Sequence, residues 1–402
     1  MKFIQIMPSE QFCSCFKAQR ILKQLPCRLK VEAVLLSQAT GRVLRETATT
    51  DREQPPFDRV MMDGFAVRST GESRRSWRVT SVQFAGDAPG RLRRSDEAIE
   101  VMTGTILPEG ADSIVPLESV RRFGDKLQLL DEAQVAAGHF IHRRSSDLAA
   151  GEQVLDPGIR LGSAAIGLLA TIGKTEVAVS CRPRVALLTT GNEVVPVEAT
   201  PRPQQVRASN ASAARAALLA AGAEVEWAHL QDDCLRLAAQ LDAWLATKDV
   251  IVAIGGVSKG REDFLPELFG ERGLCLFHRV DQRPGHPMGA WALGETAAFG
   301  LPGNPASALV CLHRYVLPFL EQLSGLPWPE PLHVPLAAEA DWPKPRDSET
   351  RFLPVQLYSG VARPFSLQNS GDLVRLGQSQ GFVEVTSAAG TSYPFLPFFP
   401  WR

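Results

Sequence analysis

The sequence predicts a multi-domain α/β protein that contains a doubly wound α/β domain with a mainly parallel sheet. At 402 residues the chain is too long for one compact core, so several domains are expected. Between residues 182 and 325, apolar runs of strand length alternate with helix-like segments, a pattern typical of a parallel sheet covered by helices. At 65–135 and 327–402, short β-prone runs stand between Gly, Pro and Asp residues and indicate smaller β domains.

Composition and charge narrow the class of protein. Hydrophobic residues make up 45% of the chain and charged residues 22%, as in ordinary globular proteins. The 43 basic and 44 acidic residues nearly cancel, which argues against a nucleic-acid partner bound through bulk charge. The seven cysteines are scattered without metal-site spacing, so reduced thiols are expected. Because no long apolar run occurs, at the N-terminus or elsewhere, we expect a cytoplasmic protein without a membrane partner.

The first part of the chain mixes predicted helices with irregular and β-rich segments. Helices are expected at 9–25 and at 31–44, and Pro55-Pro56 then breaks any helix and starts an irregular loop. After the β-rich segment, the apolar spacing at 161–173 predicts another helix that ends at its closing glycine.

The α/β segment begins with a strand at 184–190. A helix follows at 209–222, for which Ser209 or Asn210 is the expected cap and Gly222 the expected stop. The remaining elements are strands at 223–230, 249–256, 274–280 and 296–300 and helices at 235–246, 263–269 and 305–323.

Polar loops follow the predicted strands on one side of the sheet. Ligands of open α/β sheets bind beyond the carboxyl ends of the strands. The loops expected there all carry glycine, carboxylate or amide groups, and they are Thr189–Glu193, Gln231–Asp233, Gly255–Asp263 and Leu301–Pro305. A ligand site is therefore predicted at this edge, although each loop taken alone also fits a turn or a helix cap.

The third of these loops has the composition of a phosphate site. Gly255 and Gly256 expose backbone N–H groups, Ser258 supplies a hydroxyl and Lys259 a cation.

The fourth loop precedes a helix. Gly303 permits close approach of the backbone, Asn304 can cap the helix, and Pro305 suits the first helical position. The N–H groups at such a helix start attract anions.

Charged residues complete the predicted site. Cationic donors stand nearby, in and before a Pro-Gly turn, at Arg279, Arg283 and His286. Carboxylates suited to Mg²⁺, which prefers oxygen ligands, are Glu193, Asp232 and Asp263.

Eight motifs in one order resemble the molybdopterin molybdenumtransferases, the MoeA and gephyrin E-domain type. They are PPFDRVMMDGFAVR (55–68), VMTGTILPEGADSIVPLE (101–118), RRSSDLAAGEQVL (143–155), TTGNEV, GGVSKGREDF, RPGHP, LPGNPASA and QNSGDLVRL (368–376). The resemblance covers essentially the whole chain.

The resemblance implies an activity and a domain plan. The family inserts molybdate into adenylylated molybdopterin, with Mg²⁺-assisted cleavage of the adenylate and release of AMP. It implies an elongated domain from 1–47 with 136–180, an inserted β-rich domain at 48–135, an α/β domain at 181–326 and a C-terminal β domain at 327–402. It also implies a homodimer whose active cleft lies between the α/β domain of one subunit and the inserted domain of the other.

The resemblance also implies roles for particular residues. Positions that match the family's functional residues are Asp63, Thr103, Asp147, Glu193, Asp232, Asp263 and Ser370. The carboxylates among them would bind metal or position molybdate and the attacking oxygen. The GGVSKG loop and the residues Pro302, Gly303, Asn304 and Ser307 would hold the pterin phosphate.

The chain departs from the family pattern at several of these motifs. Ser145-Ser146 stands where the family has Gly-Glu, His142 where it has arginine, and Asn192 where it has aspartate. Lys259 replaces a small apolar residue, and Arg279, Arg283 and His286 replace lysines. The altered Ser145-Ser146 and Asn192 favour a non-catalytic paralogue that binds molybdopterin or scaffolds a partner, whereas the surviving carboxylates favour the transferase. Hydrolysis of another nucleotide conjugate is a third possibility.

Overall fold

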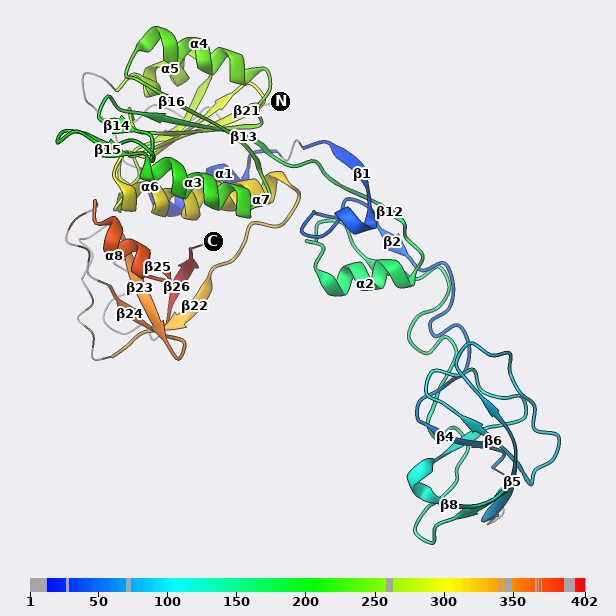
Figure 1. Cartoon of the computed structure of the whole chain (residues 1–402). Coiled ribbons are helices and arrows are strands. Elements are labelled where there is room, and N and C mark those ends of the chain that lie inside the picture. The colour runs from blue at the N-terminus through cyan, green and yellow to red at the C-terminus, as the bar shows by residue number, and fades with distance from the viewer. Residues whose placement is uncertain are drawn as a thin grey trace. The chain divides into compact units, whose positions relative to one another are not determined.

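The computed structural model describes residues 13–26, 29–69, 74–257, 263–338, 340, 342, 349–365, 367, 369, 371–386 and 395–401. The chain divides into two compact units (Figure 1). The first contains the segment up to Arg45, Pro157–Ser163 and everything from Glu176 onward, and the second contains Glu46–Asp156 and Ala164–Thr175. The predicted four-domain boundaries are finer than this division and stay a prediction.

A six-stranded mixed sheet forms the centre of the first unit. Its order is β16 (Glu224–Leu230), β13 (Arg184–Thr190), β17 (Val250–Ile254), β21 (Thr296–Leu301), β20 (Gly289–Leu293) and β18 (Leu274–His278). The first four strands run parallel to one another. β20 pairs antiparallel with β21, and β18 pairs antiparallel with β20, so β20 is the strand of this sheet that runs in the opposite direction. Every residue of β17 is buried, which explains its uninterrupted apolar sequence. The predicted α/β alternation is confirmed, but β20 was not predicted.

Helices cover both faces of this sheet (Figure 1). Alternate β13 residues point to opposite sides, so Val185 and Leu187 join one core cluster whereas Ala186 and Leu188 join the other. The first cluster packs α1 (Cys15–Lys23), α3 (Ser209–Ala220), α6 (Pro305–Cys311) and α7 (Leu317–Leu323), and the second packs α4 (Cys234–Leu245) and α5 (Leu265–Arg272).

The long helix predicted at 305–323 is present but not uniform. A π-helical turn, Leu312–Val316, separates α6 from α7. Pro318 follows this turn and lacks the N–H that a regular α-helix requires, so the irregularity has a local cause.

The prediction of a helix at 31–44 is wrong. This segment contains β1 (Val31–Leu35), which pairs antiparallel with β12 (Glu176–Ser180), and a short 3₁₀ turn at Leu36–Gln38. The apolar spacing fits either element, and pairing with a distant strand decides between them.

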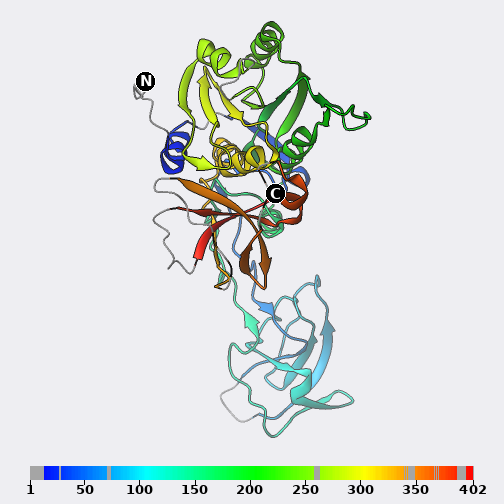
Figure 2. The ribbon, with the colours of Figure 1, turned by 90° about the vertical axis from the view of Figure 1, so that its left-hand side faces the viewer.

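A second six-stranded sheet follows the α/β segment (Figure 2, orange and red). Its order is β19 (Gln282–Arg283), β23 (Thr350–Tyr358), β25 (Gly381–Val385), β26 (Phe395–Pro400) and β22 (Leu332–Pro335), with β24 (Val361–Pro364) paired to β23. The short helix α8 (Leu373–Gln378) precedes β25. The strands predicted in the tail are confirmed.

The second unit is built on a third six-stranded sheet. Its order is β7 (Ser113–Pro116), β4 (Gly64–Val67), β6 (Glu97–Val101), β5 (Ser76–Gln83), β9 (Lys126–Leu129) and β8 (Val120–Phe123). Two-residue ladders pair β3 (Arg59–Val60) with β10 (Ile141–His142), and β2 (Ala48–Thr49) with β11 (Gln153–Leu155). The unit also contains most of α2 (Ser163–Thr171), the helix predicted at 161–173.

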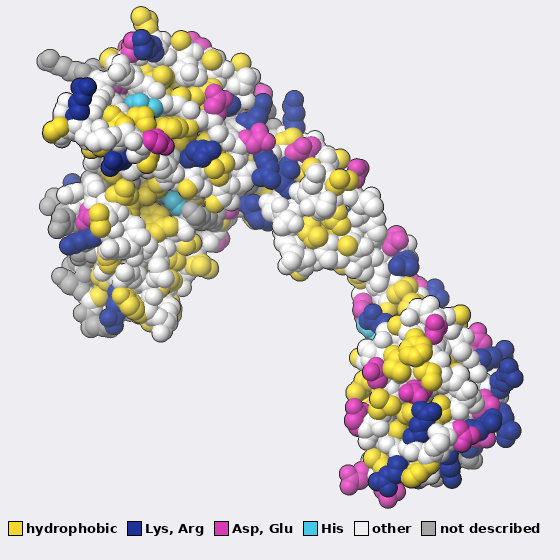
Figure 3. All heavy atoms as spheres, viewed as in Figure 1, with side chains coloured by type: hydrophobic (Ala, Val, Ile, Leu, Met, Phe, Trp, Pro, Cys, Tyr) yellow, Lys and Arg dark blue, Asp and Glu magenta, His cyan; other side chains and the backbone are white. Residues whose placement is uncertain are grey.

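Charges of both signs lie on the face of the second unit seen in Figure 3. Several pair with each other, including Arg122 with Glu100 at 2.6 Å and Arg94 with Asp96 at 3.1 Å. No helix among the described residues is long and apolar enough to cross a membrane.

Candidate functional site

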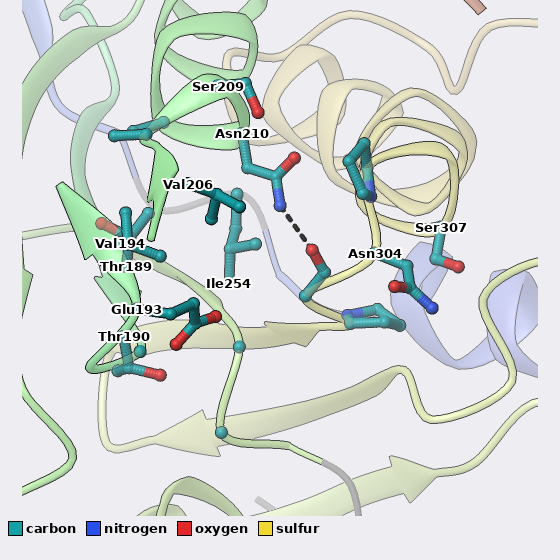
Figure 4. A pocket seen from close by; sticks show the side chains of 18 of the residues that line it. Thr189, Thr190, Glu193, Val194, Val206, Ser209, Asn210, Ile254, Asn304 and Ser307 are labelled. Atoms are coloured by element: carbon teal, nitrogen blue, oxygen red, sulfur yellow. Dashed lines mark hydrogen bonds between the residues drawn. The ribbon is translucent and has the colours of Figure 1, made fainter. Parts of the chain in front are cut away.

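A cavity of about 990 Å³ lies at the carboxyl edge of the parallel strands in the first unit (Figure 4). It is bounded by the loops that follow β13, β16, β17 and β21, as the position of ligand sites in open α/β sheets predicts. Nine residues predicted from the sequence line it: Glu193, Asp232, Gly255, Gly256, Asp263, Pro302, Gly303, Asn304 and Ser307.

The glycines after β17 are required by the local geometry. Gly255 and Gly256 have φ of 93° and 65°, in the left-handed region that glycine adopts at low cost. A Cβ at Gly255 would lie 2.9 Å from Thr190 Oγ1 and 3.2 Å from the Thr190 carbonyl oxygen. The Gly255 N–H donates to the Leu301 carbonyl at 3.0 Å, so the loop is fixed between the ends of β13 and β21.

Two helices begin at the wall of the cavity. The first residues of α3 (Ser209, Asn210) and of α6 (Pro305, Ser307) line it. The Asn210 side chain donates to the Gly303 carbonyl oxygen at 2.6 Å and so links the two helix starts (Figure 4). Their N–H groups and dipoles favour an anion in the cavity.

The predicted cap of α3 is wrong. Ser209 and Asn210 belong to the helix itself, and Ala208 occupies the cap position without a side-chain hydrogen bond. The Asn210 side-chain amide donates to the neighbouring loop instead, because that loop lies within hydrogen-bonding distance. The predicted stop at Gly222 is confirmed, because Gly222 lies just beyond the end of α3 and has a φ of 88°.

Carboxylates from three loops face the same cavity. Glu193 follows β13, Asp232 follows β16, and Asp263 precedes α5. The Asn192 side chain accepts from the Asp232 N–H at 3.4 Å and joins two of these loops. Within the described ranges, no three His, Cys, Asp or Glu side chains group closely enough to hold a metal ion. Oxygen ligands fit Mg²⁺, which takes one or two carboxylates together with substrate phosphates, so the magnesium site stays a prediction.

The predicted cationic residues lie outside the lining of this cavity. Arg283 pairs through Nε with Glu349 Oε1 at 2.5 Å, and neither Arg279 nor His286 contributes to the lining, although Pro287 does. Arg207, which lies two residues before the start of α3, is the basic residue that lines the cavity among those described. Ser258, Lys259 and Ser370 lie outside the described residues.

Further lining residues were missed as site residues by the sequence reasoning. They are Arg207, Ser209, Asn210, Pro287, Gly371 and Leu373, among others. The ribbon of β14 (Val194–Val195) and β15 (Val206–Arg207) was not predicted, and it ends beside α3. The position of Arg207, two residues before a helix that starts at the carboxyl edge, was the signal that could have identified it.

The predicted residues Asp63 and Thr103 lie together in the second unit. The Thr103 backbone N–H and hydroxyl donate to Asp63 Oδ1 at 2.6 and 2.7 Å. These bonds, the backbone one foremost, lower the pKa of the Asp63 carboxyl, which therefore stays ionised near neutral pH.

Asp147 is held in a similar way. Its Oδ1 lies 2.6 Å from His142 Nε2 and accepts from the Ser146 hydroxyl at 3.1 Å. The bond to His142 is the main cause that lowers the pKa of Asp147. The side chain is 52% exposed, so it is accessible to a ligand.

Two family profiles match the chain. Residues 13–173 match the MoeA N-terminal region (domain I and II), and residues 186–322 match a probable molybdopterin binding domain. The large cavity lies in the second segment and in the loops around it.

Relatives and solved structures agree with these profiles over nearly the whole chain. A molybdopterin molybdenumtransferase of Synechocystis is 34% identical over 90% of this chain and 93% of its own length. Molybdopterin molybdenumtransferase 2 of Mycobacterium tuberculosis is 33% identical over 93% and 96%. The molybdopterin biosynthesis moeA protein of Pyrococcus horikoshii OT3 has a TM-score of 0.80 and 25% identity, covering 97% of this chain and 98% of its own. The chain therefore belongs to the MoeA family of molybdopterin molybdenumtransferases.

Proposed function

We propose that this chain is a molybdopterin molybdenumtransferase, which inserts molybdate into adenylylated molybdopterin and releases AMP in molybdenum cofactor biosynthesis. The observation that carries the proposal is the cavity of about 990 Å³ where two helix starts and three carboxylates converge. Its size suits a drug-sized or larger ligand. Ser146 and Asn192 replace two acids of the family pattern, but the carboxylates at Asp63, Asp147, Glu193, Asp232 and Asp263 are retained. Their retention favours the transferase over the non-catalytic alternative.

Anion binding is the first task of the site. The starts of α3 and α6 offer N–H groups to phosphate oxygens, and Arg207 adds a positive charge at the same wall. Gly255 and Gly256 let a phosphate approach the backbone because they carry no side chain.

The carboxylates serve the second task, the reaction at the phosphate. Glu193, Asp232 and Asp263 are the residues proposed to hold Mg²⁺, one or two of them together with oxygens of the substrate phosphates. When bound, the ion neutralises charge on phosphate oxygens. Because carboxylates repel the anionic substrate when no cation is present, binding should strengthen with Mg²⁺.

The second unit supplies the other proposed reactive groups. The hydrogen bonds of Asp63 and of Asp147 all end on Oδ1, so within the described part of the chain Oδ2 of each residue accepts none. We propose that these two residues orient molybdate or the attacking oxygen, and that the chain acts as a homodimer.

The experiment is to incubate the purified protein with adenylylated molybdopterin, Mg²⁺ and molybdate and to measure AMP. We expect AMP release that depends on both Mg²⁺ and molybdate. Tight binding of the substrate without any AMP release would instead support a non-catalytic paralogue.

A further inference from the structure

Three side chains of the second unit form a hydrogen-bonded chain that ends on Asp147. Arg59 in β3 and His142 in β10 stand directly opposite each other in an antiparallel ladder. Arg59 Nη2 lies 2.9 Å from His142 Nδ1, and His142 Nε2 lies 2.6 Å from Asp147 Oδ1.

The partners of His142 fix the position of its proton. A guanidinium has only donors, so His142 Nδ1 must accept from Arg59. The ring of a neutral histidine then carries its proton on Nε2, and this N–H donates to Asp147. A proton on Nδ1 would point at the Arg59 guanidinium and lose that hydrogen bond.

The same contacts orient the carboxylate. Both the His142 and the Ser146 bonds end on Asp147 Oδ1. The other oxygen, Oδ2, accepts no hydrogen bond from the part of the chain that the structure describes. One oxygen is thus anchored, and the other is left to meet a ligand.

The charged residues next to this row of three hydrogen-bonded side chains form ion pairs with other residues. Arg143 pairs with Asp58 Oδ2 at 2.7 Å, and Arg144 pairs with Glu53. Arg59 and Asp147 are therefore the charged groups that bond to the imidazole from either side.

We propose that His142 is a positioning residue, which holds Asp147 through a neutral, Nε2-protonated ring whose tautomer is set by Arg59. This inference rests on the proposed function, because it assumes that Asp147 takes part in the reaction. It assigns to His142 the task of presenting Oδ2 in one orientation.

Two amide variants separate the two bonds of His142. In His142→Gln the amide nitrogen replaces Nε2 and keeps the donor to Asp147. In His142→Asn the amide oxygen replaces Nδ1 and keeps the acceptor for Arg59, while the donor to Asp147 is lost. We expect kcat for AMP release within about threefold of wild type for Gln and at least about tenfold lower for Asn, with KM little changed in both.

A spectroscopic measurement tests the tautomer without any turnover. Long-range ¹H–¹⁵N spectra of the histidine rings, with His142 assigned by its absence in His142→Gln, should show the proton on Nε2 at neutral pH. Arg59→Met should give a mixture of tautomers because the constraint on Nδ1 is gone.

The outcomes are distinguishable. An active wild type with equal kcat for the Gln and Asn variants, or a proton on Nδ1, would overturn the role of His142 and leave the proposed function standing. A wild type that releases no AMP but carries its proton on Nε2 would overturn the proposed function while the hydrogen-bonded chain remains.

Discussion

Asp63 and Asp147 lie in separate loops, yet each is anchored through Oδ1 by two donors. Donors that bond to a carboxylate favour its charged form, which explains the lowered pKa of both groups. These carboxylates are consequently fixed acceptors rather than proton donors near neutral pH. A fixed, ionised oxygen can accept a hydrogen bond and so suits the orientation of an attacking water molecule.

The Thr103 hydroxyl can be removed while its backbone bond stays. We predict that Thr103→Val raises the pKa of Asp63 toward its ordinary value, because one of two donors is lost, and that Thr103→Ser leaves it unchanged. Carboxyl ¹³C titration by NMR measures both variants. A lowered folded-state pKa stabilises the fold above the unfolded pKa, and this stabilisation is lost as the pH falls through the folded pKa. Equal titration curves for Val and wild type would show that the hydroxyl is irrelevant.

Asp147→Asn tests the proposed reactive role. We predict that kcat falls about tenfold to a hundredfold while binding of the adenylylated pterin changes little, because a fixed carboxylate acts mainly on the transition state. The matched control is Asp156→Asn, which changes an exposed carboxylate that accepts from Gln153 in the same unit. If binding falls as much as turnover, Asp147 is a ground-state contact instead.

At the scale of single elements, the loop before Asp147 contains a residue in a costly conformation. Ser145 has φ of 63°, where the family pattern has glycine. A residue with a side chain in this left-handed region raises the free energy of the folded state by about 1–2 kcal/mol. Glycine avoids this cost, but its greater conformational freedom favours the unfolded chain by about 0.4–1 kcal/mol. We predict that Ser145→Gly stabilises the second unit by up to about 1 kcal/mol, measured by urea unfolding. Ser146→Gly, which replaces a residue without positive φ, should give no gain. A loss of stability in Ser145→Gly would show that the side chain compensates for the strain.

The link between α3 and α6 gives a second test at this scale. We predict that Asn210→Ala weakens binding of the anionic pterin about fivefold, since a hydrogen bond of about 1 kcal/mol no longer holds the two helix starts together. Isothermal titration calorimetry measures the affinity for the pterin. Ser212→Ala, which removes a bond from α3 to the carbonyl oxygen of its cap residue Ala208, is the control and should bind like wild type. Unchanged affinity in Asn210→Ala would exclude this link from the site.

The elements differ in how far the sequence determines them. The fully buried strand β17 was readable because a strand covered on both faces is apolar throughout. The strand β1 was read as helix because its partner, β12, lies more than a hundred residues away in sequence. The gathering of four loops into one cavity followed from a rule about parallel sheets. The position of Arg283 could not be predicted in this way. Its partner Glu349 comes from a segment distant in sequence, and no local pattern shows that this segment approaches Arg283.

At the scale of the whole molecule, the proposed homodimer has a direct test. We predict that mixing Asp63→Ala with Asp263→Ala subunits restores activity to about a quarter of wild type, because half of the random dimers are mixed and each would contain one intact site. AMP release after subunit exchange measures it, and each variant alone is the control. The absence of any recovery in exchanged dimers would mean that one subunit supplies every group of a site.

The central claim, transfer rather than binding or hydrolysis, is tested most directly by comparing molybdenum incorporated with AMP released. Wild-type protein, adenylylated molybdopterin, Mg²⁺ and molybdate are mixed, and the pterin product is separated and analysed for molybdenum. The proposed function predicts equal molar amounts of pterin-bound molybdenum and AMP. AMP without incorporated molybdenum would contradict it and identify a hydrolase of nucleotide conjugates.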